Sequence, residues 1–149
     1  MSSLTYPVPI PPGCSQRLVP VAEFRAGPLA RQVGPGVPNS EDAGDGLDLH
    51  RYLIAHPAST FIFRVQGRGL EGIGVQAGDM VPIDRSLAPQ SGNLVLAVVD
   101  GDFALGILRC AGNTYELHGA GEGAAPLCFK DGEPLRVVGV ARGMVRKLL

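Results

Sequence analysis

Residues 94–105 read LVLAVVDGDFAL, and this stretch decides the fold class of the chain. Two runs rich in apolar and β-branched residues flank the dipeptide Asp100-Gly101. Such a dipeptide between apolar runs is a strong signal for a β-hairpin, because a type I′ turn needs positive φ at both central residues. The stretch therefore predicts two antiparallel strands, 94–99 and 102–105, joined by a tight turn.

Similar apolar and β-branched runs recur through the second half of the chain and predict further strands. These lie at 60–65, 79–84, 114–118 and 135–142. One short helix is expected over 48–56, with Asp48 as its cap and Pro57 ending it. Leu49, Tyr52 and Leu53 share one face of this helix at spacings of three and four. The sum is a mainly β, mostly antiparallel domain, and runs 61–65 and 94–99 are expected to carry its core.

The first 46 residues differ from the rest in lacking apolar periodicity and in being punctuated by proline and glycine. We interpret residues 1–46 as an extended N-terminal arm that lies on a surface or in solvent and is not a domain of its own. Residues 47–149 then form the single β domain, a size consistent with the 149-residue length.

Charge and cysteine content exclude several classes of protein. The net charge of −1 gives no field to hold a polyanion, so direct nucleic-acid binding is not expected. The chain shows no signal-peptide pattern and no apolar run of membrane-spanning length, which indicates the cytoplasm. Three cysteines without a CxxC pair predict neither a disulfide framework nor a metal site, and no cofactor is expected. Cys110 and Cys128 are predicted to be small buried core residues.

Three segments, in order and with matching spacing, resemble the LexA/UmuD family of self-cleaving serine peptidases. They are 47–61, 72–84 and 91–103, and the resemblance extends over roughly residues 33–149. It is greatest to the UmuD branch, because a Pro/Gly-rich arm cannot supply the helix-turn-helix domain of LexA-type repressors. The resemblance implies a β-clip or SH3-like barrel of antiparallel strands with one short helix and an extended N-terminal arm, and it implies a homodimer.

The family's catalytic serine/lysine pair has no counterpart in this sequence. The family motif Gly-Asp-Ser-Met reads Gly-Arg-Gly-Leu at 67–70, which puts Gly69 at the nucleophile position. The position of the base is Gly106, and the two positions lie 37 residues apart, as in the UmuD pattern. A serine hydroxyl needs a neighbouring neutral amine to take its proton, and glycine offers neither group. Gly69 is also open to a simpler interpretation as an ordinary loop glycine that permits positive φ.

The family cuts itself within the arm at an X-Gly bond, and two bonds here are candidates. Val33-Gly34 fits the register counted back from the β domain, whereas Ala26-Gly27 fits the family's residue types better. Pro35 and Pro28 follow the two glycines, and proline hinders docking of a substrate segment as a strand.

Two functions from different classes follow from these observations. The first is a UmuD-like pseudo-peptidase, a dimeric interaction subunit of the SOS response and translesion DNA synthesis, whose partners would be a translesion DNA polymerase and a RecA-type filament. The second is a peptidase that still cleaves its own arm through catalytic residues not recognised here. A phage-type regulator that lacks its DNA-binding domain is a third, lesser alternative.

Overall fold

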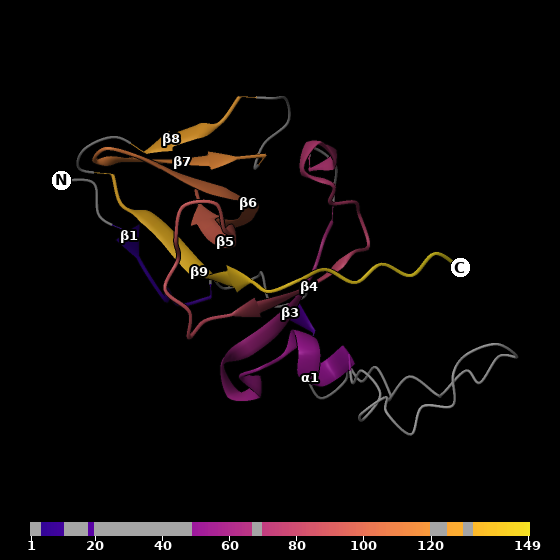
Figure 1. Cartoon of the computed structure of the whole chain (residues 1–149). Coiled ribbons are helices and arrows are strands. Elements are labelled where there is room, and N and C mark those ends of the chain that lie inside the picture. Colours follow the sequence, from indigo (N-terminus) through magenta and orange to yellow (C-terminus); the bar gives the residue numbers. More distant parts are fainter. Residues whose placement is uncertain (1–3, 11–17, 20–48, 67–69, 120–124, 130–132) are drawn as a thin grey trace, which may run out of the picture.

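The computed structural model describes residues 4–10, 18–19, 49–66, 70–119, 125–129 and 133–149 (Figure 1). Within these ranges, nine strands form one sheet: β1 (Leu4–Thr5), β2 (Leu18–Val19), β3 (Thr60–Arg64), β4 (Met80–Asp84), β5 (Leu94–Val99), β6 (Asp102–Ala111), β7 (Thr114–His118), β8 (Leu127–Phe129) and β9 (Leu135–Ala141). Helical structure in the same ranges comprises α1 (Leu49–Leu53) and the 3₁₀ turns η2 (Pro57–Ser59) and η3 (Glu71–Ile73). The predicted mainly β fold is confirmed.

The hairpin predicted from residues 94–105 is present with the expected turn. Strands β5 and β6 pair antiparallel from Leu94↔Ile107 to Val99↔Asp102 without a register shift. Asp100 and Gly101 have φ of 51° and 78°, the positive angles that a type I′ turn requires. Strand β6 runs on to Ala111, further than predicted, because it also pairs with β7.

The strand order is β2-β3-β4-β9-β5-β6-β7-β8, and β1 pairs with β9 outside this path. All of these pairs are antiparallel except β1–β9, which is parallel. In Figure 1, β6, β7 and β8 lie above β9, while β3, β4 and α1 lie below it. Strand β9 therefore joins two halves of the β domain. No helix in the described ranges is long and apolar enough to cross a membrane.

Two apolar clusters fill the interior, and successive residues of β5 contribute to them in turn. Leu96 belongs to the first cluster, with Phe63, Val81 and Ile83 among others. Val95 and Ala97 belong to the second, which also contains Leu108, Leu117 and Val137. Side chains of a strand point alternately to its two faces, so β5 is buried on both sides. The prediction that residues 94–99 carry the core is confirmed, because Val95 and Leu96 are fully buried.

The short helix is present, but its apolar face is not buried in the core. It spans Leu49–Leu53, contains no buried residue, and leaves Tyr52 67% exposed. The buried contact of this segment comes from Ile54 just beyond the helix. The helix ends at Leu53 and not at His56 as predicted, and Pro57 opens the 3₁₀ turn η2 instead of ending the helix. The proposed cap, Asp48, lies outside the described residues.

The predicted burial of the two cysteines is wrong, because Cys110 and Cys128 are both exposed. Cys110 lies near the far end of β6, where the last three residues of the strand are exposed. Cys128 lies in β8, which ends the path of paired strands. Beyond Ile107, β6 no longer pairs with β5, and β8 has β7 as its neighbour on one side only of the described sheet. Fewer elements therefore cover these two cysteines than the apolar composition of their strands suggests.

Parts of the N-terminal arm belong to the sheet. Leu4–Thr5 pairs with β9, and Leu18–Val19 pairs with β3. Val8 is 2% exposed and belongs to the first apolar cluster. These residues therefore pack with the β domain, and the domain boundary at residue 46 stays a prediction.

Candidate functional site

Of the two positions compared with the family's catalytic pair, the structure describes one. Gly106 lies buried in β6, where it pairs with Val95 of β5 within an unbroken ladder. Gly69 and both candidate bonds, Val33-Gly34 and Ala26-Gly27, lie outside the described residues. Leu70, directly after Gly69, packs against the first apolar cluster. Of the two lysines, Lys147 is exposed in the C-terminal tail, and Lys130 lies outside the described ranges.

The loop that follows Leu70 is held by the C-terminal tail through a buried carboxylate. Arg146 donates two hydrogen bonds of 2.8 Å to the two oxygens of Asp79, which is 1% exposed. The same guanidinium donates to the carbonyl of Gly74 at 2.8 Å. Next to this contact, Met80 and Val145 exchange two backbone hydrogen bonds of 2.9 and 2.8 Å. The tail is thereby fixed beside the loop that follows position 69.

Hydrogen bonding decides the charge state of Asp79. The hydrogen bond from Arg146 holds the pKa of Asp79 below its ordinary value of 3.8, and burial opposes this effect without overcoming it. The amide of Gln76, which donates to Asp79 Oδ2 at 2.8 Å, and the charge of Arg146 lower the pKa further. The same contact raises the pKa of Arg146. The pair is thus ionised at neutral pH.

The lowered pKa predicts a specific loss of stability in acid. The contribution of Asp79 is complete above its unfolded pKa of 3.8 and is lost as the pH falls through the lower folded value. We expect Asp79→Asn to have a lower Tm than the wild type at pH 7, and the gap to shrink below about pH 4. Thermal melts of both proteins at pH 7, 5, 4 and 3 measure this. A gap that stayed constant down to pH 3 would contradict the prediction.

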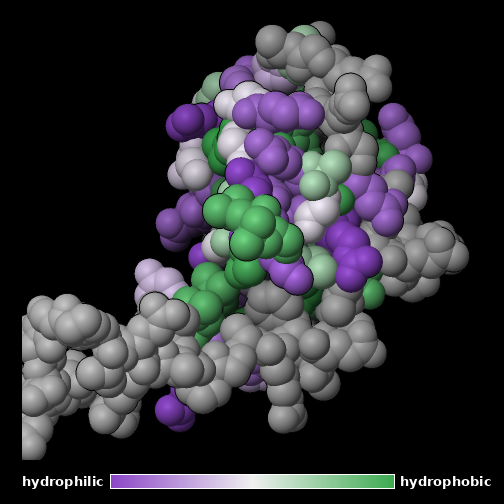
Figure 2. Space-filling model, turned by 90° about the vertical axis from the view of Figure 1, so that its right-hand side faces the viewer, coloured by the Kyte–Doolittle hydropathy of each residue, from purple (hydrophilic) through white to green (hydrophobic). Residues whose placement is uncertain are grey.

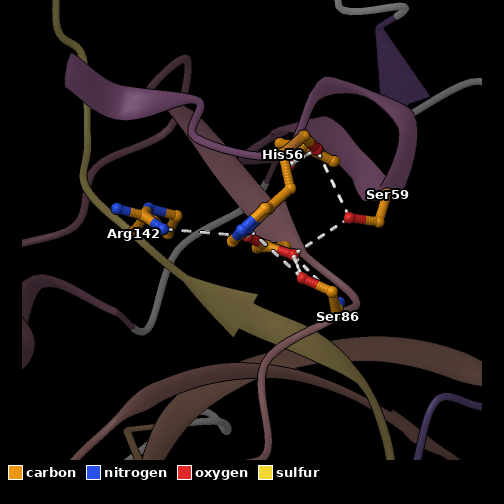
Figure 3. A network of polar contacts seen from close by, with 6 residues as sticks. His56, Ser59, Ser86 and Arg142 are labelled. Atoms are coloured by element: carbon orange, nitrogen blue, oxygen red, sulfur yellow. Dashed lines mark hydrogen bonds and ion pairs between the residues drawn. The ribbon is translucent and has the colours of Figure 1, made fainter. Parts of the chain in front are cut away.

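A second buried carboxylate, Asp84, organises a polar network at the end of β4 (Figure 3). The side chain is fully buried and accepts from His56 Nδ1 at 2.7 Å, from the Ser86 hydroxyl at 2.6 Å and from the Ser86 amide at 2.9 Å. Ser59 donates to it at 3.3 Å, and Arg142 lies 3.8 Å away. The network joins the segment after α1, the end of β4 and the residue that follows β9.

Burial alone pushes the pKa of Asp84 upward, because a carboxylate loses its hydration. The hydrogen bonds from Ser86 and His56 outweigh burial, and the pKa of Asp84 is below its ordinary value. Asp84 is therefore a buried anion that several donors stabilise.

Serine, histidine and aspartate occur together here, but their arrangement does not suit nucleophilic catalysis. In a catalytic triad the carboxylate contacts one imidazole nitrogen and the serine contacts the other. Here Ser86 Oγ lies 3.3 Å from His56 Nδ1, the nitrogen that contacts Asp84, and Ser86 donates its proton to Asp84 at 2.6 Å. The hydroxyl proton is therefore donated to the carboxylate and not to the imidazole. The network has a structural role, in which it holds three segments of the chain together.

One cleft of the described residues has a lining that does not include Gly106. It has a volume of roughly 600 Å³ and opens between the tip of the β5–β6 hairpin, β8 and the start of β9. Its lining combines apolar and charged residues: Val98, Val99, Asp100, Gly101, Leu127, Cys128, Phe129, Glu133, Pro134 and Arg136. Nearby, Glu116 contacts His118 at 2.8 Å and Cys128 Sγ at 3.9 Å. In the described part of the chain, no group of three or more His, Cys, Asp or Glu side chains is arranged to hold a metal.

Sequence reasoning did not identify the two buried carboxylates. A signal was present, because Asp79 and Asp84 bracket an apolar strand in which every residue from 81 to 84 is buried. An acidic residue in such a place needs donors, since a buried charge is tolerated only when paired. Their partners, Arg146 and His56, stand 67 and 28 residues away in sequence and could not be matched to them without the fold.

Comparison with known proteins identifies related sequences. A family model described as Peptidase S24-like matches residues 28–142. Protein ImpA of Escherichia coli is 40% identical over 74 residues, which cover 50% of this chain and 51% of ImpA. Protein MucA of Escherichia coli is 36% identical over 59 residues, 40% of each chain.

The LexA repressor of Shewanella baltica is 32% identical over 123 residues, which cover 80% of this chain and 59% of LexA. The chain spans about half the length of the first curated relatives that it matches. The resemblance to the LexA/UmuD family is confirmed, since the family model covers most of the sequence and the fold is the expected mainly β one. The chain belongs to the Peptidase S24-like family.

Proposed function

We propose that this protein is a UmuD-like pseudo-peptidase that acts as a dimeric interaction subunit in the SOS response and translesion DNA synthesis. The observation that carries the proposal is Gly106, a residue without a side chain in an otherwise regular β5–β6 ladder. An amine at this position is what the family's chemistry needs to activate a serine hydroxyl. The strand is retained and the base is absent, which favours a scaffold over a peptidase.

An interaction role needs exposed apolar surface, and the C-terminal end of the chain supplies some. Large apolar side chains that are exposed include Tyr52 of α1 and, in the tail, Met144, Leu148 and Leu149, with Leu148 at 86%. Both α1 and the tail lie on the side of Figure 1 that faces the viewer in Figure 2, where apolar surface gathers. Contiguous apolar surface on a monomer is typical of protein–protein contacts. A second copy, a translesion DNA polymerase and a RecA-type filament are the proposed partners, and the cytoplasm is the proposed location.

The alternative, a serine peptidase that uses other residues, would draw on the Asp84 network, where serine hydroxyls lie beside a histidine and a carboxylate. Its chemistry argues against this, because Ser86 donates to Asp84, whose hydrogen bonds hold its pKa below the ordinary value and make it a weak base. A hydroxyl that is to attack a peptide bond must instead donate to a base that can accept the proton.

We predict that the pure protein does not cleave itself, either at alkaline pH or with an activated RecA-type filament. Loss of a nucleophile from a catalytic unit costs on the order of 10⁶ in rate, so no fragment should accumulate in a day. Intact-mass measurement of the wild type and of Ser86→Ala reads the result, with a LexA repressor as positive control. Light scattering on the same samples reports the oligomeric state.

A fragment of residues 34–149 or 27–149 from the wild type would overturn the pseudo-peptidase proposal. If Ser86→Ala stopped that cleavage, the Asp84 network would be the active site. A purely monomeric protein at tens of micromolar that binds neither partner would overturn the interaction role.

A further inference from the structure

Strand β9 has one edge that the other long strands leave partly open. On one side β5 pairs with it from Val95↔Val140 to Val98↔Arg136. On the other side β4 pairs only with its end, at Ile83↔Ala141 and Asp84↔Val140. The edge from Leu135 to Val138 lies in the interior, since Leu135 and Val137 are fully buried. Its backbone groups therefore need another hydrogen-bonding partner. An unpaired edge inside a core is costly, because its amides and carbonyls have no water to bond.

Residues 4–8 fill this edge. Leu4 and Thr5 pair in parallel with Leu135 and Arg136, and the amide of Val8 donates to the carbonyl of Val137 at 3.1 Å. In Figure 1 the indigo β1 runs alongside the yellow β9.

Side chains fix the same segment in the interior. Val8 is 2% exposed and belongs to the first apolar cluster, while Leu4 packs against the second. Arg85, whose guanidinium lies 5.7 Å from the centre of the Phe61 ring, donates to the carbonyl of Val8 at 3.0 Å. The segment thus contributes to both clusters and to the backbone ladder of β9.

We propose that residues 4–10 are a complementing strand whose docking on β9 does not depend on the chain that follows it. Adding an extended segment to an open sheet edge is a known mode of peptide recognition, in which main-chain hydrogen bonds provide affinity and side-chain pockets provide specificity. A cut at Val33-Gly34 or Ala26-Gly27 then leaves a nicked protein of two associated chains and does not release the N-terminal piece. Strand β2, which pairs Leu18 with Phe63, precedes both bonds and adds to the retention.

The direct test inserts a recognition site for a sequence-specific protease between Val33 and Gly34 of the full chain. After complete cutting, gel filtration followed by mass spectrometry shows which pieces travel together. We expect the N-terminal fragment to co-elute with the β domain in equal amounts at low micromolar concentration. Elution of the fragment on its own would overturn the proposal.

A matched pair of variants separates docking by this strand from non-specific adhesion. Val8→Asp places a charge at a buried position of the segment, whereas Thr5→Asp places one at an exposed position of the same segment. After cutting and gel filtration, we expect at least 10-fold more of the N-terminal fragment to separate from the β domain in Val8→Asp than in Thr5→Asp. Equal retention by the two variants would contradict docking through the buried face.

Hydrogen exchange on the intact chain tests the docking of this strand even if the inserted site is not cut. Hydrogen exchange read by mass should show the amide of Val8 protected to within about 10-fold of the neighbouring amides of β9, because it is bonded to Val137. Exchange of Val8 at the rate of an unstructured peptide would overturn the proposal. Neither the protease experiment nor the hydrogen exchange depends on whether the protein cleaves itself. Failure of this inference can therefore be distinguished from failure of the pseudo-peptidase proposal.

Discussion

Gly139→Ala is expected to destabilise the protein by about 3 kcal/mol or more, which corresponds to a fall in Tm of roughly 10 °C. A Cβ built at Gly139 would lie 2.7 Å from Ile83 Cγ2 and 2.8 Å from the backbone oxygen of Asp84. Real contacts of this kind essentially never fall below 3.0 Å. Strand β4 cannot retreat easily, because Asp84 is held by the polar network and pairs with Val140. Glycine therefore permits the close approach of β9 to β4.

Gly72→Ala is the matched control for this substitution. A Cβ at Gly72 meets nothing within 4 Å, and its backbone is not in the left-handed region. We expect its free energy of unfolding to stay within about 1 kcal/mol of the wild type, or to rise slightly through a lower entropy of the unfolded chain. Urea unfolding of the three proteins provides the comparison. Similar midpoints for Gly139→Ala and the wild type would show that β4 and β9 are not in close contact.

Asp84→Ala is expected to cost roughly 3 kcal/mol, because a buried carboxylate that satisfies several donors is removed. The amide and hydroxyl of Ser86 lose their acceptor, and His56 loses its 2.7 Å contact. Asp84→Asn should not rescue the site, since the amide group turns one acceptor into a donor that faces other donors. The measurement is again the urea midpoint at pH 7.

Asp100→Asn serves as the control for Asp84→Ala, because Asp100 is exposed in the β5–β6 turn and asparagine tolerates its φ of 51°. We expect it to change stability by no more than about 0.5 kcal/mol. Hydrogen exchange of Asp84→Ala should also speed up in residues 49–56, since His56 no longer ties that segment to β4. An Asp84→Ala protein as stable as Asp100→Asn would mean that the network forms without contributing to the fold.

The prediction from sequence succeeded where the information is local. The turn at Asp100-Gly101 follows from the need for positive φ at two adjacent residues, and the structure has it. The strand Thr114–His118 has the predicted bounds, and the bounds of Thr60–Arg64 and Met80–Asp84 differ by one residue. β-branched and apolar patterns are read from neighbouring residues, so they carry over directly into strands.

Local patterns failed where exposure depends on distant segments. Leu49 and Tyr52 share one apolar face of the predicted helix, and such a face usually packs against a core. No residue of the five-residue helix is buried, however, and Tyr52 is 67% exposed. Cys110 and Cys128 were expected in the core and are exposed. Whether an apolar position is covered is set by which element packs over it, and composition does not state this.

The sequence by itself determined the class of fold, the positions of most strands along the chain and the family, since periodicity, turn residues and ordered motifs are properties of contiguous residues. It also determined that positions 69 and 106 carry no catalytic side chain. Only the tertiary structure decided which distant residues are in contact. Asp79 binds Arg146, and Asp84 accepts hydrogen bonds from His56, Ser59 and Ser86. Val8 donates a backbone hydrogen bond to the edge of β9. These contacts join residues up to 129 positions apart, and their pairing follows from strand register and chain crossing, which no local pattern specifies.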